Sequence, residues 1–191
     1  MEEQLFQVFN AFSILSEEEI SKVIADGKIK KLQKGEFFAK EGEVCNQVAV
    51  VVEGMFRSFY YNSNSEEITY CFRSENDFLS AYSSFLTGAP STESFQALTA
   101  ATYLCWDKSY IQELEKASIN WVRFFKRLTE LEYIEMEQRI FLLQKENAEQ
   151  RYLKLREQNP HYLQRIPLNY LSSYLGITQR HLSRIRKEVL I

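Results

Sequence analysis

Polar and basic side chains suited to reading nucleic-acid bases recur near the C-terminal end of the chain. They are Thr178, Gln179, Arg180, Ser183, Arg184 and Lys187. On a helix that begins after Thr178, the other five share the face opposite to Leu182, Ile185 and Val189. Arginine or glutamine near the start of such a helix can pair bidentately with guanine or adenine in the major groove of DNA. The spacing therefore predicts base readers on one helix face, with Thr178 as the N-cap.

The residues just before this helix predict the first half of a helix-turn-helix. Pro167 fits the first turn of a helix, where its missing N–H is not needed. The apolar residues that then face one side are Leu168, Leu171 and Leu175. Gly176 supplies a sharp turn and Ile177 fills the angle between the two helices. In such a motif the second helix enters the major groove by its N-terminal residues.

Charge is distributed unevenly along the chain, although its net value is only −3. Residues 151–191 contain eight basic and two acidic residues, whereas residues 1–150 contain 15 basic and 24 acidic residues. A short basic segment attached to an acidic one indicates that one part contacts nucleic acid. Lys154, Arg156 and Arg165 are further candidates for phosphate contacts, although a solvated polar surface explains each of them equally well.

Catalytic, metal-binding and membrane functions find little support. Cys45, Cys71 and Cys105 form no close pair, and with two histidines they make no zinc ligand set, so we expect buried, inert thiols. The chain has no GxSxG motif, and its six glycines form no phosphate-binding loop. We therefore expect a non-enzyme without a metal or cofactor. The acidic N-terminus lacks signal-peptide features and no stretch is apolar enough to span a bilayer, which predicts a cytoplasmic protein.

Residues 28–107 predict an antiparallel β-domain. Short runs rich in Val, Ile, Phe and Tyr alternate there with turn signals. The turn signals include Lys34-Gly35, Glu41-Gly42 and Glu53-Gly54. Before this region, Ser16 and Glu19 form a capping box that predicts a helix over residues 16–26. A hydrophobic content of 45% is ample for buried cores.

The stretch from Ser109 to about Glu157 contains no glycine or proline and predicts one long helix, with or without an interruption. Its apolar stripe consists of Trp121, Phe124, Leu128, Leu131 and Ile134. This stripe must be buried, either against the chain's own β-domain or in a seam between two copies. We favour a dimer seam, because so long a helix overhangs a β-domain of this size and DNA readers of this kind are usually two-fold symmetric.

Taken together, these features resemble the Crp/Fnr superfamily of bacterial transcription regulators over essentially the whole chain. The motifs that carry the resemblance are Lys34-Gly35-Glu36-Phe37, Glu41-Gly42-Glu43, Val52-Glu53-Gly54, Leu175-Gly176-Ile177-Thr178 and Leu182-Ser183-Arg184-Ile185-Arg186-Lys187. Asn76-Asp77-Phe78 followed by residues 84–91 is similar to the form seen in regulators of the Bacteroidetes group. The resemblance implies an α+β fold. Its parts would be an N-terminal antiparallel β-roll (a double-stranded β-helix or jelly roll like that of cyclic-nucleotide-binding proteins), a long central dimerisation helix and a C-terminal helix-turn-helix.

The resemblance also implies domains, partners and readers. Residues 1–112 would form the sensor, residues 113–148 the dimerisation helix and residues 149–191 the DNA-binding domain. The residues at base-reading positions are Gln179, Arg180 and Arg184, of which Arg184 matches best. The partners implied are double-stranded DNA, a second copy of the chain and, as a further candidate, RNA polymerase, with no membrane. Since the sequence stops at Ile191, we expect the β-hairpin wing that usually follows to be short or absent.

The chain departs from its cyclic AMP-binding relatives in the segment that would hold the nucleotide. Those relatives hold the ribose with a Gly-Glu pair and the cyclic phosphate with an Arg-Ser or Arg-Thr pair. The corresponding residues here are Ser80-Ala81 and Ser91-Thr92, with Tyr82 beside the first pair. Without the arginine there is no charge-assisted contact to the phosphate, so we expect no cyclic AMP binding of the usual kind. The candidate pocket then holds an unidentified small-molecule effector or no ligand.

A second departure concerns the DNA reader. Many relatives have an acidic residue that accepts a hydrogen bond from cytosine where this chain has Arg180, and arginine prefers guanine. We therefore expect a different half-site, repeated one helical turn away in a two-fold dimer. The alternative function is a β-roll sensory or protein-interaction module that acts through a partner protein. Such a module would expose apolar residues on its last helix, whereas here the outward face is polar and basic.

Overall fold

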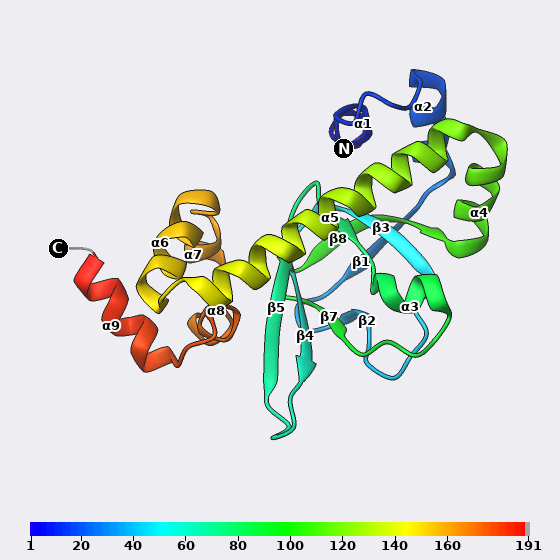
Figure 1. Cartoon of the computed structure of the whole chain (residues 1–191). Coiled ribbons are helices and arrows are strands. Elements are labelled where there is room, and N and C mark those ends of the chain that lie inside the picture. Colours follow the sequence, from blue (N-terminus) through cyan, green and yellow to red (C-terminus); the bar gives the residue numbers. More distant parts are fainter. Residues whose placement is uncertain (190–191) are drawn as a thin grey trace. The chain divides into compact units, whose positions relative to one another are not determined.

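The computed structural model describes residues 1–189, which form two compact units (Figure 1). The first unit consists of Met1–Tyr60 and Phe72–Glu130, and the second of Tyr61–Cys71 and the chain from Leu131 onward. The chain therefore passes from the first unit to the second within a helix, between Glu130 and Leu131. The functional division into sensor, dimerisation helix and DNA-binding domain stays a prediction.

Two four-stranded sheets make up the β-roll. The strands are β1 (Lys28–Leu32), β2 (Phe37–Ala39), β3 (Gln47–Glu53), β4 (Phe56–Tyr61), β5 (Glu67–Arg73), β6 (Phe78–Leu79), β7 (Ser94–Ala97) and β8 (Ala101–Asp107). The strand orders are β1-β8-β3-β6 and β2-β7-β4-β5, and the pairing is antiparallel, with Lys28 of β1 opposite Cys105 of β8. The α+β class with an antiparallel β-roll is confirmed. The short strand β6 is an element that the hydrophobic runs did not indicate.

Aromatic side chains fill the space between the two sheets. Phe38 and Phe56 of one sheet meet Tyr103 of the other, with ring centroids 5.4 and 6.3 Å apart. Between β3 and β4 the chain turns at Gly54, whose φ is 102°. A Cβ at this position would lie 2.7 Å from the carbonyl oxygen of Ala100, so only glycine fits. Glycine is thus required at position 54 both by the backbone conformation and by the close packing around it.

Two helices precede the β-roll. The helix α2 (Glu17–Asp26) begins with the predicted capping box, in which Ser16 Oγ accepts from the N–H of Glu19 and the Glu19 carboxylate accepts from the N–H of Ser16. The helix α1 (Glu2–Asn10) was not predicted. Its residue Phe9 packs edge-on against Trp106, with ring centroids 5.8 Å apart, and belongs to the core of the first unit. The N-terminal segment is therefore part of the fold.

Three helices complete the middle of the chain, namely α3 (Tyr82–Thr87), α4 (Lys108–Ala117) and α5 (Ile119–Lys145). The predicted long helix is interrupted at Ser118, whose φ of −152° and ψ of 136° are extended. Trp121 and Phe124, near the start of α5, are 3% and 0% exposed and lie in the core of the first unit. Leu128 packs partly against this core, whereas Leu131 is 40% exposed.

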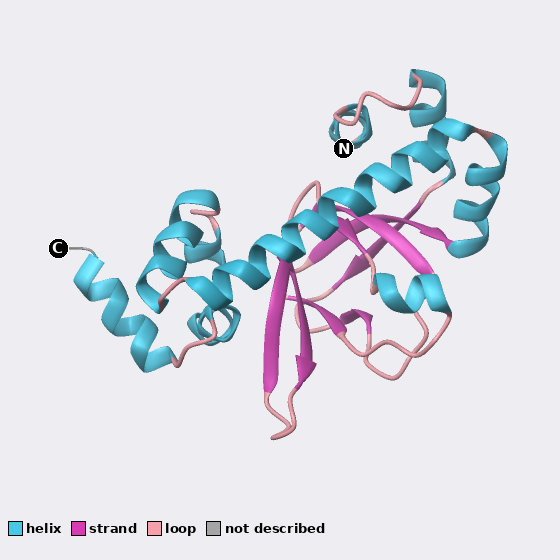
Figure 2. Cartoon of the chain, in the orientation of Figure 1, coloured by secondary structure: helices cyan, strands magenta, loops and turns pink. Residues whose placement is uncertain are grey.

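After α5 the described chain consists of short helices joined by loops (Figure 2). They are α6 (Ala148–Gln158), α7 (Tyr162–Arg165), α8 (Leu168–Leu175) and α9 (Gln179–Val189). The new start at α6 has a local cause, because the side chain of Asn147 accepts a hydrogen bond from the N–H of Gln150 and caps the helix. The expectation about a wing concerns residues after Val189, which lie outside the described residues.

Candidate nucleic-acid interface

The helices α8 and α9 form a hairpin around a left-handed glycine. Gly176 has φ 66° and ψ 37° and ends α8, and its N–H donates to the carbonyl oxygen of Ser173. The N–H of Ile177 donates to the carbonyl oxygen of Ser172, which completes the C-terminal cap. Pro167 was expected within the first turn of α8, but it precedes the helix as its N-cap, because its ψ of 143° is extended. The sharp turn expected at Gly176 is present.

The packing of α9 leaves one of its faces to solvent. Leu182 is 0% exposed and Ile185 is 3% exposed, and both lie on the side of α9 that packs within the second unit. The N-terminal turn is capped by Thr178, whose Oγ1 accepts a hydrogen bond from the N–H of His181 at 3.2 Å. These two features fix which side chains of α9 remain on the surface.

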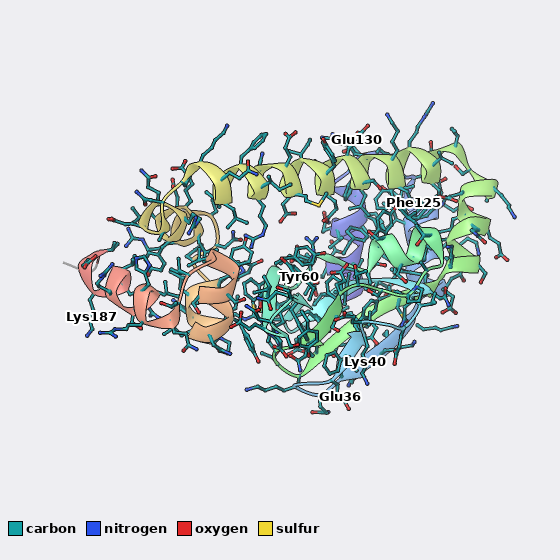
Figure 3. The ribbon with its side chains drawn as sticks, turned by 60° about the horizontal axis from the view of Figure 1, so that its bottom comes forward. Glu36, Lys40, Tyr60, Phe125, Glu130 and Lys187 are labelled. Carbon is teal, nitrogen blue, oxygen red and sulfur yellow. The ribbon has the colours of Figure 1, made fainter. Side chains whose placement is uncertain are left out.

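The outward face of α9 carries the residues that the sequence pattern singled out. Gln179, Arg180, Arg184 and Lys187 are exposed, and Ser183 is half-buried. Lys187 points away from α9 in Figure 3. Arg184 makes one long contact, from its Nε to Glu188 Oε1 at 3.7 Å, and its side chain is 68% exposed. An ion pair so open to water holds the guanidinium only weakly, so Arg184 is available to a ligand.

The basic residues of α6 are occupied differently. Arg151 Nη1 donates to the carbonyl oxygens of Leu143 and Glu146 at the end of α5, and Lys154 Nζ lies 2.7 Å from Glu146 Oε1. Arg151 thus satisfies carbonyls at the C-terminal end of α5, whereas Lys154 forms a side-chain ion pair. Of the three suggested phosphate contacts, Lys154 is thus ion-paired within its own unit, and its contact with phosphate stays a prediction. Arg156 and Arg165 are exposed, and their contact with phosphate stays a prediction.

Hydroxyl groups of the expected nucleotide segment bond to the chain itself. Ser80 Oγ donates to the carbonyl oxygen of Gln47 at 3.1 Å, and Ala81 is 1% exposed without any polar side chain to offer. Tyr82 stacks on Phe85, with ring centroids 6.0 Å apart, and its hydroxyl lies 3.2 Å from Thr129 Oγ1. The loop and α3 thus use these side chains to hold their own shape.

The second pair of the expected nucleotide segment is Ser91 and Thr92. Ser91 Oγ donates to the carbonyl oxygen of Glu93 and accepts from its N–H, while Thr92 is exposed. The Glu93 carboxylate in turn accepts a short hydrogen bond from Ser58 Oγ, and Ser58 is 0% exposed. The Ser91 hydroxyl is therefore used by the backbone of its own loop, while the Thr92 side chain stays at the surface.

Sequence reasoning missed a buried cation in the same β-roll. Arg57 of β4 is only 2% exposed. Its Nε and Nη2 donate to Gln96 Oε1 on the neighbouring strand β7 at 3.1 and 2.8 Å, and its guanidinium lies 4.0 Å from the ring centroid of Phe59. The available signal was an arginine inside the run Phe56–Tyr61, in which four of the six residues are aromatic. Hydrogen bonding and stacking on an aromatic face are the conditions under which arginine is buried.

The cysteines are free thiols, of which Cys45 and Cys105 are buried. Burial raises the pKa of the Cys105 thiol, which keeps it protonated and unreactive near neutral pH. Among the described residues, no cluster of His, Cys, Asp and Glu could hold a metal ion. None of the described helices combines the length and apolar character needed to cross a bilayer.

Comparisons with known proteins place the fold. Residues 29–118 match the family model of the cyclic nucleotide-binding domain. Comparison with curated protein sequences yields no match. Among solved structures, FixK2 from Bradyrhizobium japonicum shares the fold with a TM-score of 0.73 at 18% identity, over 85% of this chain and 84% of its own.

Two further structures cover nearly the whole chain. CLP of Xanthomonas campestris, described as a c-di-GMP responsive global regulator, has a TM-score of 0.71 at 12% identity, over 90% of each chain. The catabolite activator protein of Thermus thermophilus has a TM-score of 0.60 at 18% identity, over 92% of this chain and 84% of its own. At such identities the likeness shows a shared fold. The chain thus combines a cyclic nucleotide-binding-like β-roll with a C-terminal helical segment.

Proposed function

We propose that the protein is a sequence-specific DNA-binding transcription regulator of the Crp/Fnr type, acting in the bacterial cytoplasm. The observation that carries this proposal is the outward face of α9, on which Arg180, Arg184 and Lys187 are exposed beside Gln179 and Ser183. A capped helix with such a face is suited to insertion into the major groove, where its first turns reach base edges. Its buried side is occupied by Leu182 and Ile185, so the helix can present no apolar face to a partner protein.

The proposed regulator acts as a homodimer paired through α5. Because Trp121 and Phe124 are buried in their own unit, the seam is formed by the apolar residues that stay exposed farther along the helix. These are Leu131, Tyr133, Ile134, Met136, Ile140, Phe141 and Leu143. Among them Leu131, Ile134 and Phe141, at steps of three and seven, share one helix face that continues the stripe of Leu128, and this face is the seam we propose. Two copies would place two α9 helices on half-sites one helical turn apart.

The β-roll is proposed to sense a signal other than cyclic AMP, or to act without a ligand. In this fold the anionic cyclic phosphate needs a cation, whereas the corresponding loop offers Ser91, whose hydroxyl bonds to the backbone of Glu93. Arg57 is no substitute, since its guanidinium is committed to Gln96 and Phe59. The loop motif Asn76-Asp77-Phe78 supports placing the regulator with those of the Bacteroidetes group.

The test begins with DNA selected from a random pool by the wild-type chain. In gel retardation, Arg180→Ala combined with Arg184→Ala should lower the affinity for the selected fragment at least about tenfold, since one good bidentate pair contributes about 1–3 kcal/mol. The matched control is Lys31→Ala with Lys34→Ala, which removes the same charge from exposed positions of the first unit and should bind as the wild type does. An equal loss of affinity in both variants would mean that binding depends on nonspecific charge, and it would refute base reading by α9.

A further inference from the structure

The end of α8 that leads into α9 is tied to a β-strand by one hydroxyl group. Ser173 Oγ accepts a hydrogen bond from the N–H of Thr69 at 2.9 Å and donates to the carbonyl oxygen of Glu67 at 3.2 Å. Thr69 and Glu67 belong to β5, the terminal strand of its sheet. All three residues belong to the second unit. The hydroxyl thus satisfies one backbone N–H and one backbone carbonyl group at the edge of β5, as the backbone of a neighbouring strand would.

The same end of α8 is held from a second side by α5. Arg139 Nη2 donates to the carbonyl oxygen of Tyr174 at 2.8 Å, and the guanidinium lies 3.7 Å from the Tyr174 ring centroid. This carbonyl belongs to the last turn of α8, where helix carbonyls lack partners within the helix. A cation at a helix C-terminus also interacts favourably with the helix dipole. The residues before Gly176 are therefore anchored to both β5 and α5.

The contact between α8 and β5 shields Thr69 of β5 from solvent. Thr69 is 0% exposed, although a terminal strand ordinarily offers its backbone groups to water. Its side-chain Oγ1 is buried and has no hydrogen-bond partner within the described part of the chain. Without the Ser173 hydroxyl, the N–H of Thr69 would be buried and unsatisfied as well, which would destabilise the contact between the strand and the helix.

We infer that Ser173 is a positioning residue for DNA recognition, through which β5 sets the orientation of the α8–α9 hairpin. The strand continues into Phe72 and Arg73, which belong to the first unit, so a displacement of β5 caused by a signal there is delivered to α8 and, across Gly176, to α9. This inference rests on the proposed DNA-binding function. It assigns a regulatory role to a residue outside the outward face of α9.

The experiment compares Ser173→Ala with two matched variants in the full-length protein. Ser173→Thr keeps a hydroxyl at this place. Ser172→Ala removes a buried neighbouring hydroxyl that donates only within its own helix, to the carbonyl oxygen of Asn169 at 2.9 Å. The first readout is hydrogen exchange of the Thr69 amide. The second is the ratio of affinities for the selected operator and for the same operator with two base pairs inserted between its half-sites, which rotates one half-site by about 70°.

In Ser173→Ala the Thr69 amide should exchange at least about fivefold faster, as expected for the loss of a hydrogen bond, and the affinity ratio should fall by a similar factor because the hairpin is less constrained. Ser173→Thr and Ser172→Ala should keep the wild-type values. If Ser173→Ala does not fold, Arg139→Leu loosens the same end of α8 and should lower the affinity ratio in the same way.

The outcomes separate the two proposals. A wild-type chain that selects no DNA sequence refutes the proposed function itself. A wild-type chain that binds its operator, with the Thr69 exchange and the affinity ratio unchanged in Ser173→Ala, overturns the positioning role alone. If Ser172→Ala changes the ratio as much as Ser173→Ala does, the effect belongs to helix stability, and the inference is likewise overturned.

Discussion

Replacing Phe124 or Phe141 of α5 by alanine should affect different properties, the first the stability of the fold and the second self-association. Phe124 is 0% exposed, and its ring centroid lies 4.7 Å from that of Phe12 and 5.6 Å from those of Phe9 and Trp121. Phe124→Ala removes these contacts and leaves a cavity, which should lower the free energy of unfolding by about 3–5 kcal/mol. For a chain of this size, such a loss lowers Tm by about 6–20 °C.

Phe141, also on α5, is 43% exposed and has Lys145 Nζ 4.5 Å from its ring centroid. Phe141→Ala should therefore change the free energy of unfolding of the dilute monomer by no more than about 0.5 kcal/mol. It should instead weaken self-association, because Phe141 belongs to the proposed seam. The two variants thus separate the part of α5 that is core from the part that pairs.

The assay is urea denaturation at low protein concentration, followed by tryptophan fluorescence, since Trp106 and Trp121 both lie in the core around Phe124. Sedimentation velocity at micromolar concentration then reports the oligomeric state. If Phe124→Ala stays within about 1 kcal/mol of the wild type, the first half of α5 is not core as described. If Phe141→Ala leaves the sedimentation of a dimer unchanged, or the wild type sediments as a monomer, the proposed seam is wrong.

Further predictions concern the β-roll loop, the recognition helix and acid stability. Isothermal titration with cyclic AMP and cyclic GMP should show no micromolar binding, because the loop at Ser91 offers no cation; saturable heat at such concentrations would contradict this. Leu182→Ala empties a fully buried site in α9 and should lower stability by about 2–5 kcal/mol and abolish operator binding, measured by urea denaturation and gel retardation; retained operator affinity would show that α9 is not the reader. Partial burial opposes ionisation of Glu19, but hydrogen bonds from Ser118, Ser16 and Asn120 outweigh it and lower the pKa of this carboxyl group. Its contribution to stability is therefore present above the unfolded-state pKa and lost as the pH falls through the folded-state pKa, so Glu19→Gln should flatten the decline in stability between about pH 5 and pH 3; a decline as steep as in the wild type would count against the network.

Features with local causes could be predicted from the sequence. The capping box of Ser16 and Glu19 and the turns at Gly54 and Gly176 depend on a few neighbouring residues, and the structure has them where expected. The outward face of α9 followed from helical periodicity alone. The helix α1 lacked both a capping signal and a long periodic pattern, and its order depends on the packing of Phe9 against distant aromatic residues.

Features that depend on tertiary contacts could not be predicted. Periodicity showed that the stripe on α5 must be buried, but it could not tell which surface covers Trp121 and which covers Leu131. The burial of Arg57 depends on Gln96, 39 positions away, and the contact of Ser173 depends on Thr69, 104 positions away. A single sequence does not show which residues pair over such distances, even where one of them, such as Arg57, is unusual at its own place.

The pairing of β1 with β8 has a consequence for the order in which the protein can fold during synthesis. Lys28 leaves the ribosome 77 residues before its partner Cys105, a delay of about 4–15 s at bacterial rates of translation. During that time the strand Lys28–Leu32 has a bare edge, open to pairing with other nascent chains. Its three lysines disfavour such pairing by charge repulsion, so the strand resists aggregation with other chains until β8 emerges.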